Sequence, residues 1–234
     1  VRSIFERTNA IAECRFVVRS TEDRTLLLKT FETLIINCRI PLLVSQSGYN
    51  KKHHEPGGKA MDRKILVAFF SRAGENYCNG KLVSLSVGNT ELTAGKIAAM
   101  IGAELFKIEP LRMYADNYRA CTEEAKQELQ SNARPGLKQY LDSLDPYHTI
   151  ILAYPNWWNT MPMPVWTFLE HYDFSGKEIL PLCTHEGSAL GRSVSDIRKL
   201  CPGAEVEAGL AIRGGNVEQS DDQIRKWLEG AGLL

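Results

Sequence analysis

Three short polar segments, each following an apolar run, concentrate the residues whose types and spacing could do chemistry. The residues of interest in the first segment are Ser71, Arg72, Ala73, Gly88, Asn89 and Thr90. A helical pattern starts at Thr90, and backbone N–H groups at a helix start, aided by the helix dipole, favour a phosphate. Gly88 would let the backbone approach that anion. The segment predicts a phosphate site, although Thr90 could be only a helix cap, and Arg72 could pair with the phosphate or be only solvated.

The second segment is rich in aromatic and amide side chains. It comprises Pro155, Asn156, Trp157, Trp158, Asn159 and Thr160. Two adjacent tryptophans at the end of a strand are costly to expose unless they cover something, and a flat ring system would stack on one of them. The alternative is that both tryptophans pack onto neighbouring helices. We expect one tryptophan to pack in this way and the other to border a ligand.

The third segment, residues 184–191, combines small residues with a histidine beside a glutamate. Its candidates for ligand contact are His185, Glu186, Gly187, Ser188 and Gly191. Backbone groups in such a segment can form hydrogen bonds with the edge of a planar heterocycle. His185 has the chemistry of a general acid or base, but it fits a wall residue equally well, so no catalytic residue is assigned.

Regular apolar patterns after Met61 must position these segments. We expect strands at residues 64–70, 104–108, 149–154, 178–184 and 206–212, although Pro181 weakens the fourth of them. We expect helices at residues 90–101, 118–131, 164–172, 193–200 and 221–228, with a further helical turn or two at 136–144. Strands that alternate with helices predict a mostly parallel α/β sheet with right-handed crossovers. Such sheets bind ligands beyond the carboxyl ends of their strands, which is where the three segments fall.

Residues 1–60 differ from the rest of the chain. They contain no methionine, carry 10 Lys and Arg against 6 Asp and Glu, and end in a linker-like stretch at 45–60 that includes His53 and His54. We expect both histidines to be solvated rather than metal ligands. Read back into codons, residues 57–60 could encode a ribosome-binding site just ahead of Met61. We therefore expect translation to begin at Met61, and residues 1–60 to be non-native or disordered. The alternative is a real extension that covers the site or a partner.

Composition excludes several classes of protein. The formal net charge is zero and the isoelectric point is about 7.1, so no global positive field argues for nucleic acid. No apolar run reaches the roughly 20 residues that a membrane-spanning helix needs. The six cysteines have no metal-ligand spacing and suit a reducing compartment. We expect a cytoplasmic protein that binds neither nucleic acid nor membrane.

The three segments together resemble the flavodoxin family, in the branch with a second loop like WWGTMPMPV and a third loop like THEGSGLG. Here these loops read Trp157 through Val165 and Thr184 through Gly191. The resemblance covers nearly all of residues 61–234 and implies a flavodoxin-like, doubly wound five-stranded parallel sheet of order 2-1-3-4-5, with helices on both faces. It also implies a noncovalent flavin mononucleotide (FMN), with its phosphate in the first loop and its isoalloxazine ring between the other two.

Two features depart from the family pattern. Asn159 and Ala189 stand where glycine is usual, which could shift the backbone angles beside the ring. The compact phosphate loop S-x-T-G-N-T is split, with its start at Ser71 and its end at Gly88–Thr90. Because the helical pattern follows Thr90, we place the helix start there and leave residues 73–87 as an expanded loop, free to contact ring, ribose or partner.

Function is less determined than fold. The leading hypothesis is an FMN protein that carries electrons between redox partner proteins, a reductase on one side and an acceptor on the other. The alternative is an FMN-dependent NAD(P)H oxidoreductase that acts on quinones or other small acceptors. No dinucleotide fingerprint follows any strand, so a nicotinamide would bind only transiently over the flavin. A partner-binding module that has lost its flavin is a third hypothesis, and the retention of all three loops argues against it.

Overall fold

The structure, a computed structural model, describes residues 64–234 of the 234-residue chain. The expectations for residues 1–60, for translation from Met61 and for His53 and His54 lie outside the described residues. Within the described part of the chain, no helix is long and apolar enough to cross a membrane.

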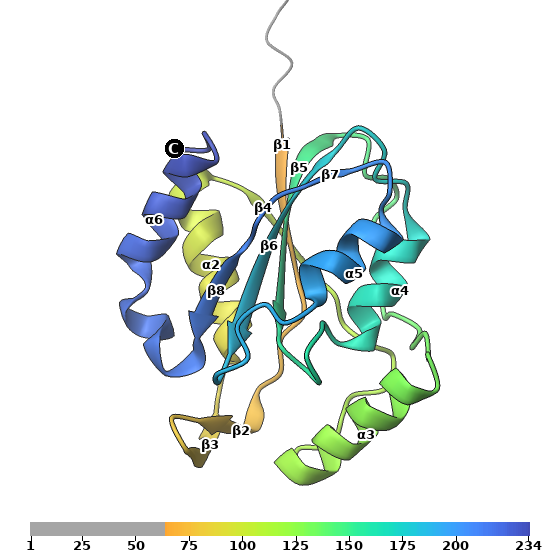
Figure 1. Ribbon diagram of the computed structural model, residues 1–234, viewed down its shortest axis with the longest axis vertical. Coiled ribbons are helices and arrows are strands. Elements are labelled where there is room, and N and C mark those ends of the chain that lie inside the picture. Colours follow the sequence, from red (N-terminus) through yellow and green to blue (C-terminus); the bar gives the residue numbers. More distant parts are fainter. Residues whose placement is uncertain (1–63) are drawn as a thin grey trace, which may run out of the picture. The chain divides into compact units, whose positions relative to one another are not determined.

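A parallel sheet forms the centre of the fold, and its strands end at the lower side of Figure 1. In spatial order the strands are β4 (Glu104–Lys107), β1 (Lys64–Phe69), β5 (Tyr147–Pro155), β6 (Glu178–His185), and then β7 (Glu205–Val206) and β8 (Leu210–Arg213). β7 and β8 both pair with β6 and share the place of one expected strand. The doubly wound α/β fold and the order 2-1-3-4-5 are confirmed, but the expectation of one continuous fifth strand is wrong.

The break in the fifth strand lies opposite Pro181 of β6. The N–H of Glu207 donates to the carbonyl of Ile179 (3.0 Å), so the backbone groups of Ile179 face β7. Backbone groups alternate in direction along a strand, so Pro181 faces the same side, where it has no N–H to donate. Gly209 turns the chain there with φ +71°, and a Cβ at Gly209 would lie 2.9 Å from the carbonyl oxygen of Pro181. Pro181 thus belongs to a strand and interrupts the pairing on one side of it.

Helices cover both faces of the sheet (Figure 1). One face carries α2 (Asn89–Ile101) and α6 (Asp221–Gly230), and the other carries α4 (Met163–His171) and α5 (Ser193–Leu200). Alternate side chains of a strand serve the two layers: Val67 packs with the α2 and α6 cluster, and Leu66 with the α4 and α5 cluster. This double cover explains why β1 and β5 are apolar almost throughout.

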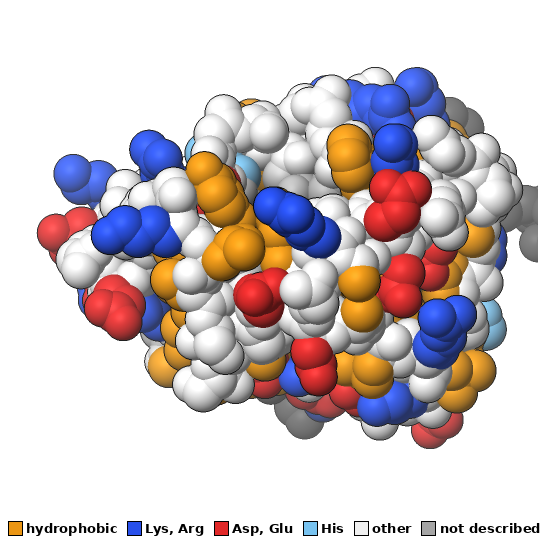
Figure 2. All heavy atoms as spheres, turned by 90° about the horizontal axis from the view of Figure 1, so that it is seen from below, with side chains coloured by type: hydrophobic (Ala, Val, Ile, Leu, Met, Phe, Trp, Pro, Cys, Tyr) orange, Lys and Arg blue, Asp and Glu red, His pale blue; other side chains and the backbone are white. Residues whose placement is uncertain are grey.

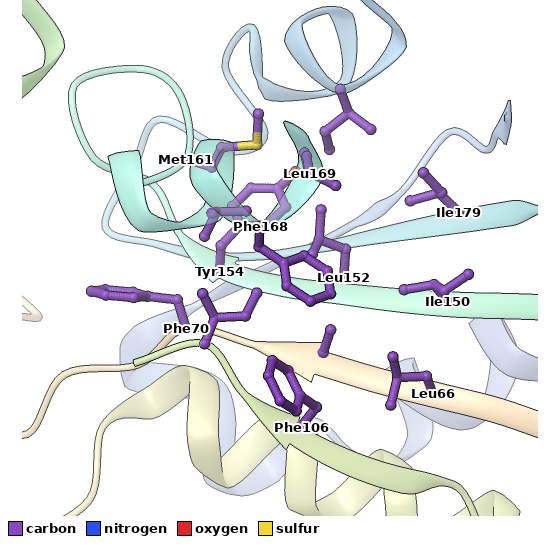
Figure 3. Packing of buried hydrophobic residues seen from close by; sticks show 14 of the residues in the cluster. Leu66, Phe70, Phe106, Ile150, Leu152, Tyr154, Met161, Phe168, Leu169 and Ile179 are labelled. Carbon is purple, nitrogen blue, oxygen red and sulfur yellow. The ribbon is translucent and has the colours of Figure 1, made fainter. Parts of the chain in front are cut away.

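The larger of the two core clusters lies under α4. Figure 3 shows Phe168 and Leu169 of α4 over Ile150 and Leu152 of β5. Phe168 is fully buried and stacks against Phe106 of β4, with ring centroids 5.6 Å apart. Packing of this kind holds the ends of the strands, and therefore the loops that follow them, in fixed positions.

The chain between β1 and α2 forms a β-hairpin rather than an open loop. β2 (Gly74–Cys78) and β3 (Lys81–Leu85) pair antiparallel and form a small sheet of their own at the lower end of Figure 1. The turn consists of Asn79 and Gly80, with φ of 50° and 83°. An Asn-Gly pair between two strand-like runs is a strong hairpin signal, so the sequence contained this element and the expectation of an open loop was wrong.

Two further elements differ from expectation. Residues 136–144 form no helix, because their backbone pairs with an earlier segment: Leu111 N–H donates to the carbonyl of Gly136, and Lys138 N–H to that of Glu109. A 3₁₀ helix, η1 (Gly214–Gln219), follows β8 and was not expected. The helix expected at 118–131 is present as α3 (Tyr118–Gln130), which lies beyond the carboxyl ends of the strands in Figure 1.

Candidate cofactor site

A cavity of about 620 Å³ opens at the carboxyl ends of β1, β5 and β6, where the strand order reverses. This volume is typical of sites for small molecules and cofactors. The predicted residues that line the cavity are Ser71, Arg72, Asn89, Thr90, Pro155, Asn156, Trp157, Trp158, Asn159, His185, Glu186 and Ser188. The predicted residues outside the lining are Ala73, Gly88, Thr160, Gly187 and Gly191. The fold therefore brings all three loops to one cavity, and contact of each residue with a ligand stays a prediction.

The start of α2 forms one end of the cavity. The first helical hydrogen bond runs from Leu92 N–H to the carbonyl of Gly88 (3.1 Å), so the N–H groups of Asn89 and Thr90 have no partner inside the helix. Ser71 Oγ accepts the N–H of Glu91 (3.1 Å) and thereby fixes the loop after β1 to this helix start. N–H groups without helical partners at the positive end of a helix are the kind of donors that an anion needs.

Thr90 does not cap α2. The N-cap residue is Gly88, and the Thr90 hydroxyl instead lies 2.7 Å from the hydroxyl of Thr184 at the end of β6. Gly88 itself is required by the packing of the chain: a Cβ there would lie 2.3 Å from Ser71 Oγ and 2.4 Å from the carbonyl oxygen of Arg72. The structure thus gives a packing reason for this glycine, and the access of its backbone to an anion stays a prediction.

Arg72 lines the cavity and is bonded to the backbone rather than only solvated, and its pairing with a phosphate stays a prediction. Its guanidinium group donates to the backbone carbonyls of Glu75, Ala115 and Asp116. These bonds tie the base of the hairpin to the loop before α3. Because carbonyl groups are neutral, these bonds leave the positive charge of Arg72 on the cavity wall, where it adds to the field of the helix dipole.

The two tryptophans of the second loop have different surroundings. Trp157 packs edge-on against Phe70 and Tyr114, with ring centroids 5.3 and 4.9 Å apart. Trp158 is 47% exposed, and its indole N–H donates to the carbonyl of Thr122 (2.9 Å). Trp157 therefore packs as one tryptophan was expected to, although against residues outside helices, and it lines the cavity as well. Trp158 is an exposed ring on the cavity wall, and its contact with a ligand stays a prediction.

The second and third loops are fastened to each other. Asn156 Nδ2 donates to the carbonyl of Ala189 (2.9 Å), and the N–H of Arg192 donates to the carbonyl of Asn159 (2.9 Å). Asn159 and Ala189 both have left-handed backbones, with φ of 70° and 47°. The backbone has therefore kept the conformation that glycine adopts easily at these positions, and Ala189 takes it against its own preference.

Sequence reasoning missed one wall of the cavity. Tyr118, Cys121, Thr122 and Ala125 line it from α3, at the spacing of a single helix face. Asn76 and Tyr77 of the hairpin, Thr184 and Gly214 complete the lining. Tyr77 stacks on Tyr118, with ring centroids 6.1 Å apart and an interplanar angle of 28°. The face of α3 was readable from the sequence, but the position of α3 below the strands was not.

The third loop combines a neutral histidine with a glutamate. Burial lowers the pKa of His185 from its usual value, and Nδ1 of the ring accepts the N–H of Gly187 (2.9 Å), as a neutral imidazole can. Glu186 Oε2 accepts the N–H of Asn79 at the hairpin turn (3.0 Å) and lies 3.6 Å from Arg213 Nε. Glu186 Oε1 is buried and has no hydrogen-bond partner among the described residues.

The end of the molecule that holds the cavity has no dominant charge. Figure 2 looks onto this end and shows apolar side chains interspersed with both acidic and basic ones. Of the cations near the cavity, Lys126 lies with Nζ 5.5 Å from the Trp158 ring. A field of one sign, which would steer a strongly charged partner, is not visible on this face.

Known proteins similar to this chain include one protein family and several solved structures. A family model described as Flavodoxin matches residues 64–231. A Bacteroides uniformis protein assigned as a flavoprotein is 26% identical with a TM-score of 0.57, over 71% of this chain and 98% of that chain. One from Bacteroides eggerthii is 26% identical with a TM-score of 0.55, over 71% of this chain and 96% of that chain. A Lactobacillus acidophilus flavoprotein in complex with FMN is 21% identical with a TM-score of 0.49, over 70% and 98%.

No curated protein matches the chain. The family model covers most of the sequence, and the sheet order and the cavity at the strand ends agree with it. The chain therefore belongs to the flavodoxin family.

Proposed function

We propose that the protein binds FMN noncovalently in this cavity and carries electrons through it between redox partners. The observation that carries the proposal is the convergence of three separate loops on one cavity, with a helix N-terminus at one end and an exposed tryptophan on its wall. A phosphate suits the first feature and a flat ring suits the second. Bound FMN would supply the redox chemistry, and the protein supplies binding, orientation and electrostatics.

The residues present fit the chemical parts of FMN. The N–H groups of Asn89 and Thr90 suit the phosphate, which needs donors. The buried Oε1 of Glu186 needs a donor, and the hydroxyl groups of a ribityl chain are donors. Trp158 offers an aromatic face to the isoalloxazine ring, and its ring is held by the bond to Thr122. Each part of the cofactor thus has a matching group on this chain.

A second candidate is an FMN-dependent oxidoreductase that takes electrons from NAD(P)H and gives them to a quinone or another small acceptor. It is favoured by the walls that α3 and the hairpin add to the cavity, because Tyr77 and Tyr118 restrict a large partner more than a small molecule. The mixed charge of the cavity end also gives no specific support to docking of a charged protein. For both candidates we propose a cytoplasmic location, consistent with the free thiols of Cys78, Cys121, Cys183 and Cys201.

One set of measurements tests both candidates. The full-length protein should be yellow, should release FMN on denaturation, and should take up FMN again in titration. Under anaerobic conditions a carrier should be reduced slowly by NADPH alone and quickly when a flavodoxin reductase is added. Rapid direct reduction by NADPH with turnover on a quinone would move the assignment to the oxidoreductase, and a protein that binds no flavin would refute both.

A substitution at the helix start tests the site itself. Thr90→Glu should abolish FMN binding, because it places a negative charge and extra volume beside the phosphate position. Ser195→Glu, on the exposed side of α5, adds the same charge away from the cavity and should leave binding unchanged. Equal FMN affinities of the two variants would show that the phosphate lies elsewhere.

A further inference from the structure

The hairpin is a discrete insertion in the loop after β1. The chain leaves and returns at one place, because Gly74 pairs with Leu85, and Gly88 lies so close to Arg72 that a Cβ would meet its carbonyl oxygen at 2.4 Å. If residues 74–87 were removed, Ala73 would precede Gly88 directly. The joined sequence would read Ser71-Arg72-Ala73-Gly88-Asn89-Thr90, the compact form of the loop. The hairpin can therefore be removed without changing the residues that begin and end the loop.

The base of the hairpin is fastened to the chain that leads into α3. Glu75 N–H donates to the carbonyl of Asp116 (3.3 Å). Glu75 Oε2 accepts the side-chain N–H of Asn117 (2.9 Å) and the backbone N–H of Tyr118 (2.7 Å). Together with the bonds of Arg72, these contacts fix the base on the α3 side of the cavity.

The turn of the hairpin is fastened on the other side, to the third loop. Asn79 N–H donates to Glu186 Oε2 (3.0 Å). The Asn79 side chain lies against η1, where a Cβ at Gly215 would meet Asn79 Nδ2 at 1.9 Å. Between the two attachments, Asn76 and Tyr77 line the cavity. The hairpin thus crosses the cavity from α3 to the third loop.

Glu186 both holds the hairpin turn and lines the cavity. Its Oε2 holds the turn, and its Oε1 is buried without a partner among the described residues. Gly214 leaves the room that this oxygen needs, since a Cβ there would lie 2.4 Å from Oε1. A carboxylate can only accept hydrogen bonds, and a buried acceptor without a donor is unfavourable. A ligand that brings a hydroxyl group to Oε1 removes that cost.

We propose that Glu186 accepts a ribityl hydroxyl of the cofactor with Oε1 while it holds the hairpin turn with Oε2, so that cofactor binding fastens the hairpin across the cavity. The proposal rests on the proposed function in one respect, namely that the ligand is FMN. Its consequence is kinetic: the cofactor leaves only after the turn has separated from Glu186. The hairpin makes FMN a slowly exchanging group, and Glu186 selects flavins that carry ribityl hydroxyls.

The central experiment measures FMN dissociation from the full-length protein by the recovery of free-flavin fluorescence. Glu186→Gln removes the negative charge and replaces one acceptor oxygen with an N–H₂ donor. If the amide oxygen keeps the turn, the ribityl hydroxyl can only accept from the amide, and the charge-assisted bond at this position is lost. Dissociation should become at least about tenfold faster, the effect expected for one charge-assisted hydrogen bond. Deletion of residues 74–87 should accelerate both dissociation and association. Glu229→Gln, on the exposed surface of α6, is the matched control and should change neither rate.

Two further measurements separate the hydroxyl from the hairpin. Glu186→Gln should weaken riboflavin, which has the ribityl hydroxyls, and should leave the affinity for lumiflavin, which lacks them, unchanged. FMN should slow hydrogen exchange at the amide of Asn79 in the unchanged protein and not in the Glu186→Gln variant. This measurement does not need the deletion variant, so it tests the proposal even if that variant fails to fold.

The outcomes distinguish this proposal from the proposed function. If the unchanged protein binds no FMN, the proposed function fails. If it binds FMN, but Glu186→Gln has the same dissociation rate and weakens riboflavin and lumiflavin equally, the role of Glu186 is refuted and the proposed function stands. Asn79 exchange that is unaffected by FMN would likewise overturn the fastening of the hairpin by the cofactor.

Discussion

The hydroxyl of Thr160 donates to Asp196 Oδ2 over 2.7 Å, and both residues are buried. This bond joins the end of the second loop to α5, and Asp196 is also paired with Arg192 (3.1 Å). Thr160 was expected to contact the ligand, but it lies outside the cavity lining. It supports the second loop through its bond to Asp196. Residues that hold a loop in this way determine how well a binding site is preorganised.

Thr160→Val should reveal this supporting role. The change removes the donor and leaves Asp196 with fewer partners, which should lower the free energy of unfolding by about 1–3 kcal/mol. FMN affinity should fall as well, because the second loop loses its attachment to α5. Thr167→Val on α4, where the hydroxyl makes only a 3.4 Å bond to the carbonyl of Met163, is the control and should change stability by less than about 0.5 kcal/mol. Urea unfolding and FMN titration measure both effects, and equal losses in the two variants would contradict the prediction.

Ala189→Gly should stabilise the protein. Ala189 has φ 47°, a conformation that costs a residue with a Cβ about 1–2 kcal/mol, whereas the flexibility of glycine costs about 0.5–1 kcal/mol. The net gain should be about 0.5–1 kcal/mol in urea unfolding. The same substitution at Ala99, exposed in the last turn of α2, should lower stability instead, by up to about 1 kcal/mol. Changes of the same sign at the two positions would show that the left-handed backbone at Ala189 carries no strain.

The two tryptophans should separate into a structural and a binding residue. Trp157→Ala removes a ring that packs against Phe70 and Tyr114, and it should cost about 3–5 kcal/mol of unfolding free energy. Trp158→Ala removes an exposed ring and should change stability little, but it should weaken FMN by about tenfold through lost stacking. Trp158→Phe keeps a ring without the bond to Thr122 and should be intermediate. FMN affinity that is unchanged in Trp158→Ala would place the isoalloxazine ring elsewhere.

The sequence was sufficient for the sheet and for the loops that follow its strands, because those features depend on local patterns. The apolar runs of β1 and β5 are continuous since helices cover both faces of the sheet, and Pro155 marks the end of β5. The alternation of strands with helices then predicted a mostly parallel sheet, whereas the order of its strands was what the resemblance to the flavodoxin family implied. The three loops could be predicted to lie together because each follows the carboxyl end of a parallel strand. No single loop identified a binding site by itself.

What the sequence could not show depends on contacts between distant residues. Arg72 donates to the carbonyls of Ala115 and Asp116, more than 40 positions away, so these bonds could not be read from its neighbours in the sequence. The same holds for the break in the fifth strand, which is caused by Pro181 on the adjacent strand. The cavity wall formed by α3 could not be predicted from the sequence. Helix periodicity shows that Tyr118 and Cys121 share one face of the helix, but it does not show where that helix lies relative to the sheet. The hairpin differs from these features because it could have been predicted: Asn79-Gly80 is a local signal for a hairpin turn.

The pH dependence of stability should report the environment of His185. Burial lowers the pKa of His185 from its usual 6.5, so the unfolded chain binds a proton at a higher pH than the folded protein does. The stability that neutral His185 contributes is present above the unfolded pKa and is lost as the pH falls below about 6.5 toward the lower folded pKa. Protonation also removes the ring nitrogen that accepts the N–H of Gly187.

His185→Asn keeps a side-chain acceptor near Gly187 and removes the titrating group. Urea unfolding of the apoprotein should therefore lose stability less steeply between about pH 7 and pH 5 in this variant than in the unchanged protein. His148→Asn, at an exposed position of β5 away from the cavity lining, makes the same exchange of side chains and controls for the substitution itself. Identical slopes for His185→Asn and the unchanged protein would mean that His185 titrates alike in the folded and unfolded states, and that the third loop does not hold it as a neutral wall residue.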